Sequence, residues 1–141
     1  MLRVVLDTST VVSGIIGGVS ARVIDLLVEQ RRFQAVFSDE ILREYENVLR
    51  RPRFRLPPER VNSLLAFFET HGLKVTPQNL VQVITDDPSD NKFLAAAKEA
   101  KADCVVSGDN HLLSLGKFED IPILNSRQFL QMMHAAETRT G

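Results

Sequence analysis

The 141-residue sequence holds few of the side chains that build disulfides, thiol-based active sites or zinc centres. Its single cysteine, Cys104, excludes an internal disulfide, and the run Cys-Val-Val indicates a buried strand thiol rather than a nucleophile. The three histidines, His71, His111 and His134, are isolated and lack the spacing of zinc ligands. Disulfide-stapled scaffolds, cysteine enzymes and zinc fingers are therefore disfavoured as classes.

Long apolar runs and a strong net charge are also missing. No stretch approaches the ~20 apolar residues that cross a bilayer, and the N-terminus lacks a basic region followed by a long apolar run. The formal net charge is −1, which excludes binding of nucleic acid by bulk attraction. We expect a protein of the reducing cytoplasm, without a membrane partner.

The charges are unevenly distributed along the chain. Residues 31–60 contain eight Arg and five acidic residues, a net of +3, whereas residues 86–120 contain eight acidic residues and four Lys, a net of −4. Clustered carboxylates repel one another unless a positive group neutralises them. The acidic segment therefore needs an explanation beyond solubility.

Short apolar runs alternate with segments of helical period, which is typical of an α/β fold. With 44% hydrophobic residues the chain has enough apolar side chains for a real core. We predict one domain over residues 1–141, a three-layer α/β/α arrangement with a mainly parallel central sheet. The predicted strands are Arg3–Leu6, Gln34–Phe37, 73–75, 81–85, 103–107 and Ile121–Leu124. The predicted helices are 20–31, 39–50, 58–71, 87–100, a short one after residue 109, and 127–135, with residues 136–141 as a frayed polar tail.

Two of the predicted strands end at the same kind of residue. Asp7 follows Val-Val-Leu, and Asp109 follows Val-Val-Ser-Gly. In open parallel sheets, ligands bind beyond the C-terminal ends of the strands, so both carboxylates would face one crevice. Asp90 opens the helix that precedes the second of these strands and could join them.

Glu44 is the fourth candidate acid. It lies within the helix after the second strand and shares a face with Ile41 and Val48, so it should point partly towards the core. A half-buried carboxylate needs a partner. The alternative is a surface pair with Arg43 or Arg51.

The three aspartates also have structural interpretations. Asp7 could simply end a strand, Asp109 could cap a helix, and Asp90 could form a capping box with Asp87. The joint placement of these residues and Glu44 around one crevice is what favours a functional site.

Three motifs resemble those of the PIN-domain nucleases, in the toxin-like branch found in bacteria and archaea. The opening motif is Leu-Asp-Thr-Ser-Thr-Val-Val-Ser at residues 6–13. The third acidic motif is Asp-Pro-Ser-Asp-Asn-Lys-Phe-Leu-Ala at 87–95, and the fourth is Val-Val-Ser-Gly-Asp-Asn-His-Leu-Leu at 105–113. Glu44 stands where the family has its glutamate. The order matches over nearly the whole chain, although Ser9 stands where the family usually has Asn.

The resemblance implies a metal-dependent endoribonuclease that hydrolyses RNA phosphodiester bonds. Asp7, Asp90 and Asp109 would be metal ligands, directly or through water, and Glu44 would bind a second ion or orient the water. Oxygen ligands of this kind suit Mg²⁺ or Mn²⁺. Supporting positions would be Ser9, whose hydroxyl can replace the usual Asn in hydrogen bonding, Ser107, and Asp87, either as an outer ligand or as a cap.

An arginine-rich connection follows the predicted Glu44 helix. Its side chains could contact phosphates, which positions a strand without specifying its sequence. The alternative is a solvated loop. The candidate RNA-binding residues are Arg50, Arg51, Arg53, Arg55 and Arg60.

Rival functions remain open at this point. A haloacid-dehalogenase-like phosphatase would need a second Asp where Ser9 stands, and a receiver-like domain would need paired acids near the first strand. A PIN fold kept only for binding RNA or protein is the non-enzyme alternative. The resemblance implies the toxin of a toxin–antitoxin pair or a related RNA-processing enzyme. Toxins of this type are usually bound by a small antitoxin protein and often form homodimers.

Overall fold

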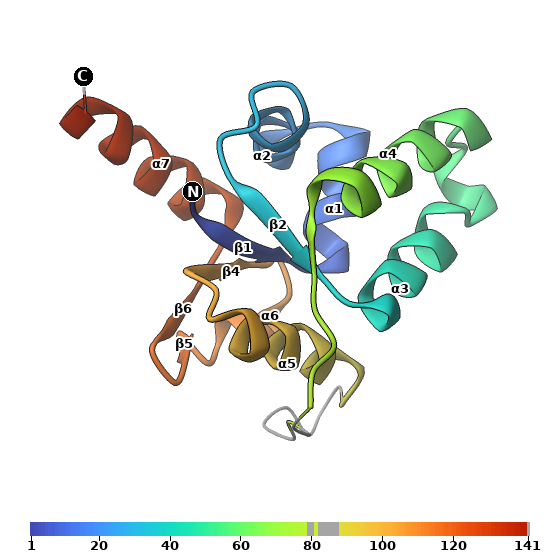
Figure 1. Cartoon of the computed structure of the whole chain (residues 1–141). Helices are drawn as coiled ribbons and strands as arrows, with labels where there is room; N and C mark the ends of the chain where they lie inside the picture. The colour runs from blue at the N-terminus through green and yellow to red at the C-terminus, as the bar shows by residue number, and fades with distance from the viewer. Residues whose placement is uncertain (79–80, 82–87, 141) are drawn as a thin grey trace.

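The computed structural model describes residues 1–78, 81 and 88–140 of the chain. Within these residues, six strands form one sheet in the order β3-β2-β1-β4-β6-β5 (Figure 1). All neighbouring pairs are parallel except β5 with β6. The strands are β1 (Arg3–Leu6), β2 (Gln34–Phe37), β3 (Leu73–Lys74), β4 (Cys104–Val106), β5 (Lys117–Phe118) and β6 (Ile121–Leu124).

Helices cover both faces of this sheet, so the predicted three-layer α/β/α architecture is confirmed. Helices α1, α2 and α7 pack together on one face, and α5 and α6 lie on the other, while α3 contacts both α1 and α5 (Figure 1). The helices are α1 (Thr8–Ile16), α2 (Val19–Val28), α3 (Asp39–Leu49), α4 (Pro58–His71), α5 (Asn91–Ala100), α6 (Asn110–Leu113) and α7 (Ser126–Thr140). Two 3₁₀ turns, η1 (Pro52–Phe54) and η2 (Pro88–Asp90), precede α4 and α5.

Helix α1 is the main element that the sequence did not predict. Its residues, Thr-Ser-Thr-Val-Val-Ser-Gly-Ile-Ile, include many β-branched side chains of modest helix propensity. Burial of its apolar face and the cap provided by Asp7 outweigh that preference. Its polar N-terminal end therefore lies directly at the end of β1.

The C-terminal boundary also differs from the prediction. Helix α7 continues to Thr140, beyond the predicted helix end at position 135. The short strand β5 was not predicted either. Residues 79–80 and 82–87 lie outside the described residues. Most of the expected strand 81–85 and the candidate Asp87 fall in the second of these ranges.

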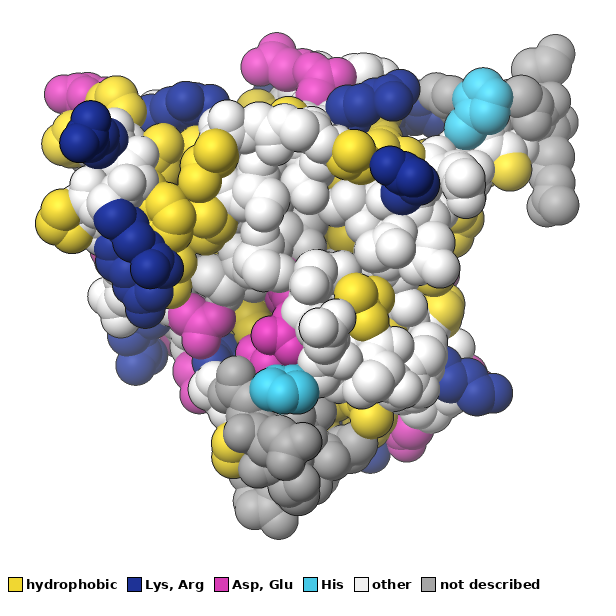
Figure 2. Space-filling view, turned by 180° about the vertical axis from the view of Figure 1, so that it is seen from behind, with side chains coloured by type: hydrophobic (Ala, Val, Ile, Leu, Met, Phe, Trp, Pro, Cys, Tyr) yellow, Lys and Arg dark blue, Asp and Glu magenta, His cyan; other side chains and the backbone are white. Residues whose placement is uncertain are grey.

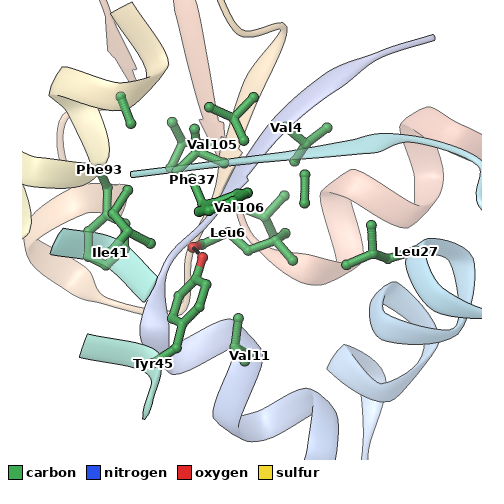
Figure 3. Packing of buried hydrophobic residues seen from close by; sticks show 14 of the residues in the cluster. Val4, Leu6, Val11, Leu27, Phe37, Ile41, Tyr45, Phe93, Val105 and Val106 are labelled. Carbon is green, nitrogen blue, oxygen red and sulfur yellow. Dashed lines mark hydrogen bonds between the residues drawn. The ribbon is translucent and has the colours of Figure 1, made fainter. Parts of the chain in front are cut away.

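The core lies between the sheet and the helices and reaches up to the C-terminal end of β1. Val4, Val5 and Leu6 are fully buried, and so is the ring of Tyr45 from α3. Figure 3 shows the Tyr45 hydroxyl directed at Leu6, where it donates a hydrogen bond to the backbone carbonyl at 2.5 Å. This bond fixes α3 against the last residue before Asp7.

In the part of the chain that the structure describes, no single helix is long and apolar enough to cross a membrane. Helices α1 and α2 meet that test of length and composition only as a pair, and they are bent by 97° at the break between them.

Candidate active site

Asp7 lies between the end of β1 and the start of α1 and is 2% exposed. Its Oδ1 accepts a hydrogen bond from the Thr10 backbone N–H at 2.9 Å, which caps α1. The Ser9 hydroxyl donates to the same carboxylate, 2.8 Å from Oδ1 and 2.9 Å from Oδ2. The Ser107 hydroxyl donates to Oδ2 at 2.5 Å. The carboxylate is thus held by donors from two elements.

Burial dominates the electrostatics of Asp7. It raises the pKa of this carboxyl above its ordinary value of 3.8, while hydrogen bonds from Ser107, Thr10 and Ser9 oppose the rise. Burial therefore makes the charged carboxylate less favourable than it is in water, and a nearby cation would offset that penalty.

The end of β4 is connected to Asp7 through two serine hydroxyls. Ser107 Oγ accepts a hydrogen bond from the Asp109 backbone N–H at 2.9 Å, and Ser9 Oγ accepts one from Gly108 N–H at 3.2 Å. A Cβ at position 108 would lie only 3.3 Å from Ser9 Oγ, so glycine suits this close approach. The predicted supporting residues Ser9 and Ser107 therefore stand beside Asp7, and they couple it to the loop that carries Asp109.

Asp90, Asp109 and His111 form a group that could hold a metal ion. One potential ligand atom from each residue lies within 4.8 Å of the others. Asp109 Oδ1 accepts a hydrogen bond from the His111 backbone N–H at 2.7 Å and lies 3.6 Å from its Nδ1. Asp90 is 9% exposed, whereas the Asp109 and His111 side chains are 33% and 47% exposed. The group therefore has a buried base and a side open to solvent, and two carboxylates with one imidazole fit a divalent transition-metal ion.

His111 is the residue that sequence reasoning missed. The spacing between the three histidines does not match a zinc site, so spacing alone gives this residue no role. Its partners are carboxylates instead, one of which lies two residues before it across the first turn of α6. The signal in the sequence was the motif Gly-Asp-Asn-His, which places an imidazole beside the strand-end carboxylate.

Glu44 lies at the side of the site, in contact with Thr8 and Lys92. The Thr8 hydroxyl donates to Oε2, and the Lys92 ammonium donates to Oε1 at 2.6 Å. The side chains of Lys92 and Glu44 are 8% and 24% exposed. The expected half-burial of Glu44 is confirmed, and its cationic partner is Lys92 from α5 instead of an arginine.

Tyr45 links these two parts of the site electrostatically. Burial raises its pKa well above the ordinary 10.0, and the charges of Asp7 and Glu44 raise it further. The phenol therefore stays protonated and donates to Leu6, as described above. Cys104, by contrast, has its pKa raised to about 12 by burial and by Asp103, which fits the predicted inert strand thiol.

The five arginines predicted to contact RNA divide into two groups. Arg50 and Arg60 are partly engaged within the protein: Arg50 pairs with Glu46 at 2.9 Å, and Arg60 donates to the Ile15 carbonyl at 3.0 Å. The other three, around η1, are exposed: they are Arg51, Arg53 and Arg55. The Arg53 guanidinium lies 4.8 Å from the centre of the Phe54 ring. Figure 2 shows basic side chains along one border of a face whose middle carries acidic side chains beside a histidine.

Comparison with known proteins agrees with this architecture. The PIN-domain family profile matches residues 3–111, so the chain belongs to the PIN-domain family, a nuclease-type fold. Solved structures that share the fold include the PIN domain of RRP44 from T. brucei, at a TM-score of 0.54 and 17% identity over 99% of this chain and 85% of that chain. No curated protein matches the sequence. The predicted family is confirmed, and its toxin-like branch stays a prediction.

Proposed function

We propose that this PIN domain is a ribonuclease that hydrolyses RNA phosphodiester bonds with the help of a divalent cation held by Asp90, Asp109 and His111. The observation that carries the proposal is the convergence of these three side chains at the C-terminal edge of a parallel sheet. Ligands bind at this edge in open α/β folds. The donor set suits a cation, and the open side of the group leaves room for a phosphate.

A divalent cation at such a site can activate a water molecule and stabilise the charge that develops on a phosphodiester. The contribution of Asp7 is different because its carboxylate is buried and hydrogen-bonded on both oxygens. Through Ser107 it fixes the backbone of Asp109, and its negative charge strengthens the attraction of the site for a cation. Arg51, Arg53 and Arg55 would contact the phosphates of the bound strand.

The presence of His111 favours Mn²⁺ over Mg²⁺. Carboxylates bind both ions, but an imidazole is a better ligand for transition metals than for Mg²⁺. The imidazole Nδ1 lies 3.6 Å from Asp109 Oδ1, so it is close to the carboxylate that would share the ion.

The test is cleavage of single-stranded RNA by the wild type, Asp109→Asn and Asp25→Asn, with Mn²⁺, with Mg²⁺ and with a chelator. Asn at position 109 can still cap α6, so the variant mainly loses the charge. Asp25 is an exposed residue of α2 and serves as the matched control. We expect cleavage that needs metal and is lost only in Asp109→Asn. Cleavage that persists in the chelator, or in Asp109→Asn at the wild-type rate, would refute the proposal.

On the motifs at residues 6–13, 87–95 and 105–113, we further propose that cleavage is endonucleolytic and that the protein is the toxin of a toxin–antitoxin pair. Induced expression in bacteria should then arrest growth, and Asp109→Asn should relieve the arrest while Asp25→Asn does not. Normal growth with soluble, metal-active wild-type protein would argue against the toxin role.

A further inference from the structure

Lys92 is a nearly buried cation inside an acidic site, and neither the motifs nor the family assignment gives it a function. Its ammonium donates to Glu44 Oε1 and to the Ser89 carbonyl, each at 2.6 Å. It also lies 5.4 Å from the centre of the Phe93 ring. With 8% of its side chain exposed, this group is held in place and is not a mobile surface lysine.

Both oxygens of Glu44 are occupied by groups of the protein itself. Thr8 from α1 donates to Oε2, and Lys92 from α5 donates to Oε1. A divalent ion bound to Glu44 would have to lie beside the Lys92 ammonium or displace it. Either is unfavourable, because like charges repel and a nearly buried ammonium would lose its carboxylate partner. Glu44 is also absent from the group formed by Asp90, Asp109 and His111.

From this geometry, and on the basis of the function proposed above, we infer that Lys92 takes the place of a second metal ion. The site then binds a single divalent cation, at Asp90, Asp109 and His111, and Glu44 is not a ligand. This differs from the sequence-based prediction that Glu44 binds a second ion or orients the water. Lys92 and one divalent ion carry three positive charges against the four carboxylates of Asp7, Glu44, Asp90 and Asp109, so a second ion is not required.

Lys92 is also a positioning residue for the metal group. By donating to the Ser89 carbonyl it fixes turn η2 one residue before Asp90, and by pairing with Glu44 it ties that turn to α3. One side chain therefore sets both the charge on the Glu44 side and the place of the Asp90 carboxylate.

The experiment counts Mn²⁺ ions bound by the full chain, from the electron paramagnetic resonance signal of free Mn²⁺ during a titration at fixed pH. We expect one ion in the wild type and one ion in Glu44→Gln. In Lys92→Gln the freed Glu44 should recruit a second ion, and the double variant Lys92→Gln/Glu44→Gln should return to one. Circular dichroism verifies that each variant is folded.

Two matched controls isolate the effect. Lys98→Gln removes another lysine of α5 that pairs with a glutamate, but on the surface, and Glu46→Gln removes an exposed glutamate of α3. Both should bind one ion. If the wild type binds two ions and Glu44→Gln loses one of them, the inference is overturned but the proposed function stands. The same holds if a folded Lys92→Gln variant binds only one ion. A wild type that binds no Mn²⁺ would overturn both.

Discussion

The Ser107 hydroxyl stands between the two strand-end aspartates: it donates to Asp7 Oδ2 at 2.5 Å and accepts from the Asp109 backbone N–H at 2.9 Å. Ser107 is 1% exposed, so both bonds are protected from water. The buried carboxylate that follows β1 is therefore linked through Ser107 to the backbone of Asp109, which follows β4.

Ser107→Ala should weaken both folding and metal binding. Asp7 and the Asp109 N–H each lose a buried partner, which costs about 1–3 kcal/mol of unfolding free energy. Urea denaturation measures this loss, and a Mn²⁺ titration measures the expected fall in affinity. Ser107→Thr keeps the hydroxyl and should recover part of the affinity, while Ser63→Ala on the exposed face of α4 should change neither quantity. Full Mn²⁺ affinity in a folded Ser107→Ala would show that Asp109 is positioned without this bond.

The raised pKa of Asp7 predicts a pH effect in metal-free buffer. Because the folded pKa lies above the ordinary 3.8, the folded state binds the proton more tightly than the unfolded chain. The contribution of the Asp7 carboxyl to the unfolding free energy is therefore fully present at low pH. It is lost as the pH rises from about 3.8 through the pKa of Asp7 in the folded state. Asp7→Asn has no titrating group at this position. The variant should therefore be more stable than the wild type at pH values above this range, and the difference in stability should be smaller at pH values below it. Melting temperatures of both proteins across pH measure the difference, and a constant difference would contradict the assignment.

His111→Gln should lower the affinity for Mn²⁺ more than that for Mg²⁺. The imidazole is the transition-metal ligand of the group, whereas the two carboxylates serve both ions. Isothermal titration with each metal gives the two ratios. His71→Gln, an exposed histidine at the end of α4, is the control. Equal losses for both metals would mean that His111 acts only through packing or charge.

The exposed arginines of the η1 connection should govern the salt dependence of RNA binding. A combined Arg51→Ala, Arg53→Ala and Arg55→Ala variant should bind RNA more weakly. Its log–log salt slope should be flatter by about 0.7 for each phosphate of a single strand that the variant no longer neutralises. Mn²⁺ binding should be unchanged because no arginine belongs to the metal group.

A control for that variant removes three other exposed cations, Lys98, Lys101 and Lys117. It changes the net charge equally but leaves the η1 connection intact. If the salt slope falls equally in both triple variants, RNA binding depends on the total charge of the protein and not on a phosphate-contacting surface at η1.

The sequence predicted the fold well where local patterns and tertiary packing agree. Val-Val-Leu before Asp7 and Cys-Val-Val before Ser107 form adjacent parallel strands as expected. Helix α1 was not predicted because its β-branched residues suggest another structure, and only burial against α2 and α3 makes it helical. Such tertiary effects leave no periodic signal in nine residues.

The partners of the four candidate acidic residues could not be predicted from the sequence. Asp7, Glu44, Asp90 and Asp109 lie around the ends of β1 and β4, as inferred from strand ends and the helix face. Sequence spacing could not show that Lys92 reaches across from α5 to Glu44, a separation of 48 positions. Nor could it show that His111 turns back towards Asp109, since that depends on the short helix α6.

Anomalous diffraction from crystals soaked in Mn²⁺ shows whether Asp90, Asp109 and His111 hold a divalent cation. We expect one anomalous peak, within coordination distance of these three side chains and separated from Glu44 by the Lys92 ammonium. The absence of a peak here at saturating Mn²⁺, or a peak bound by Glu44 instead, would contradict it.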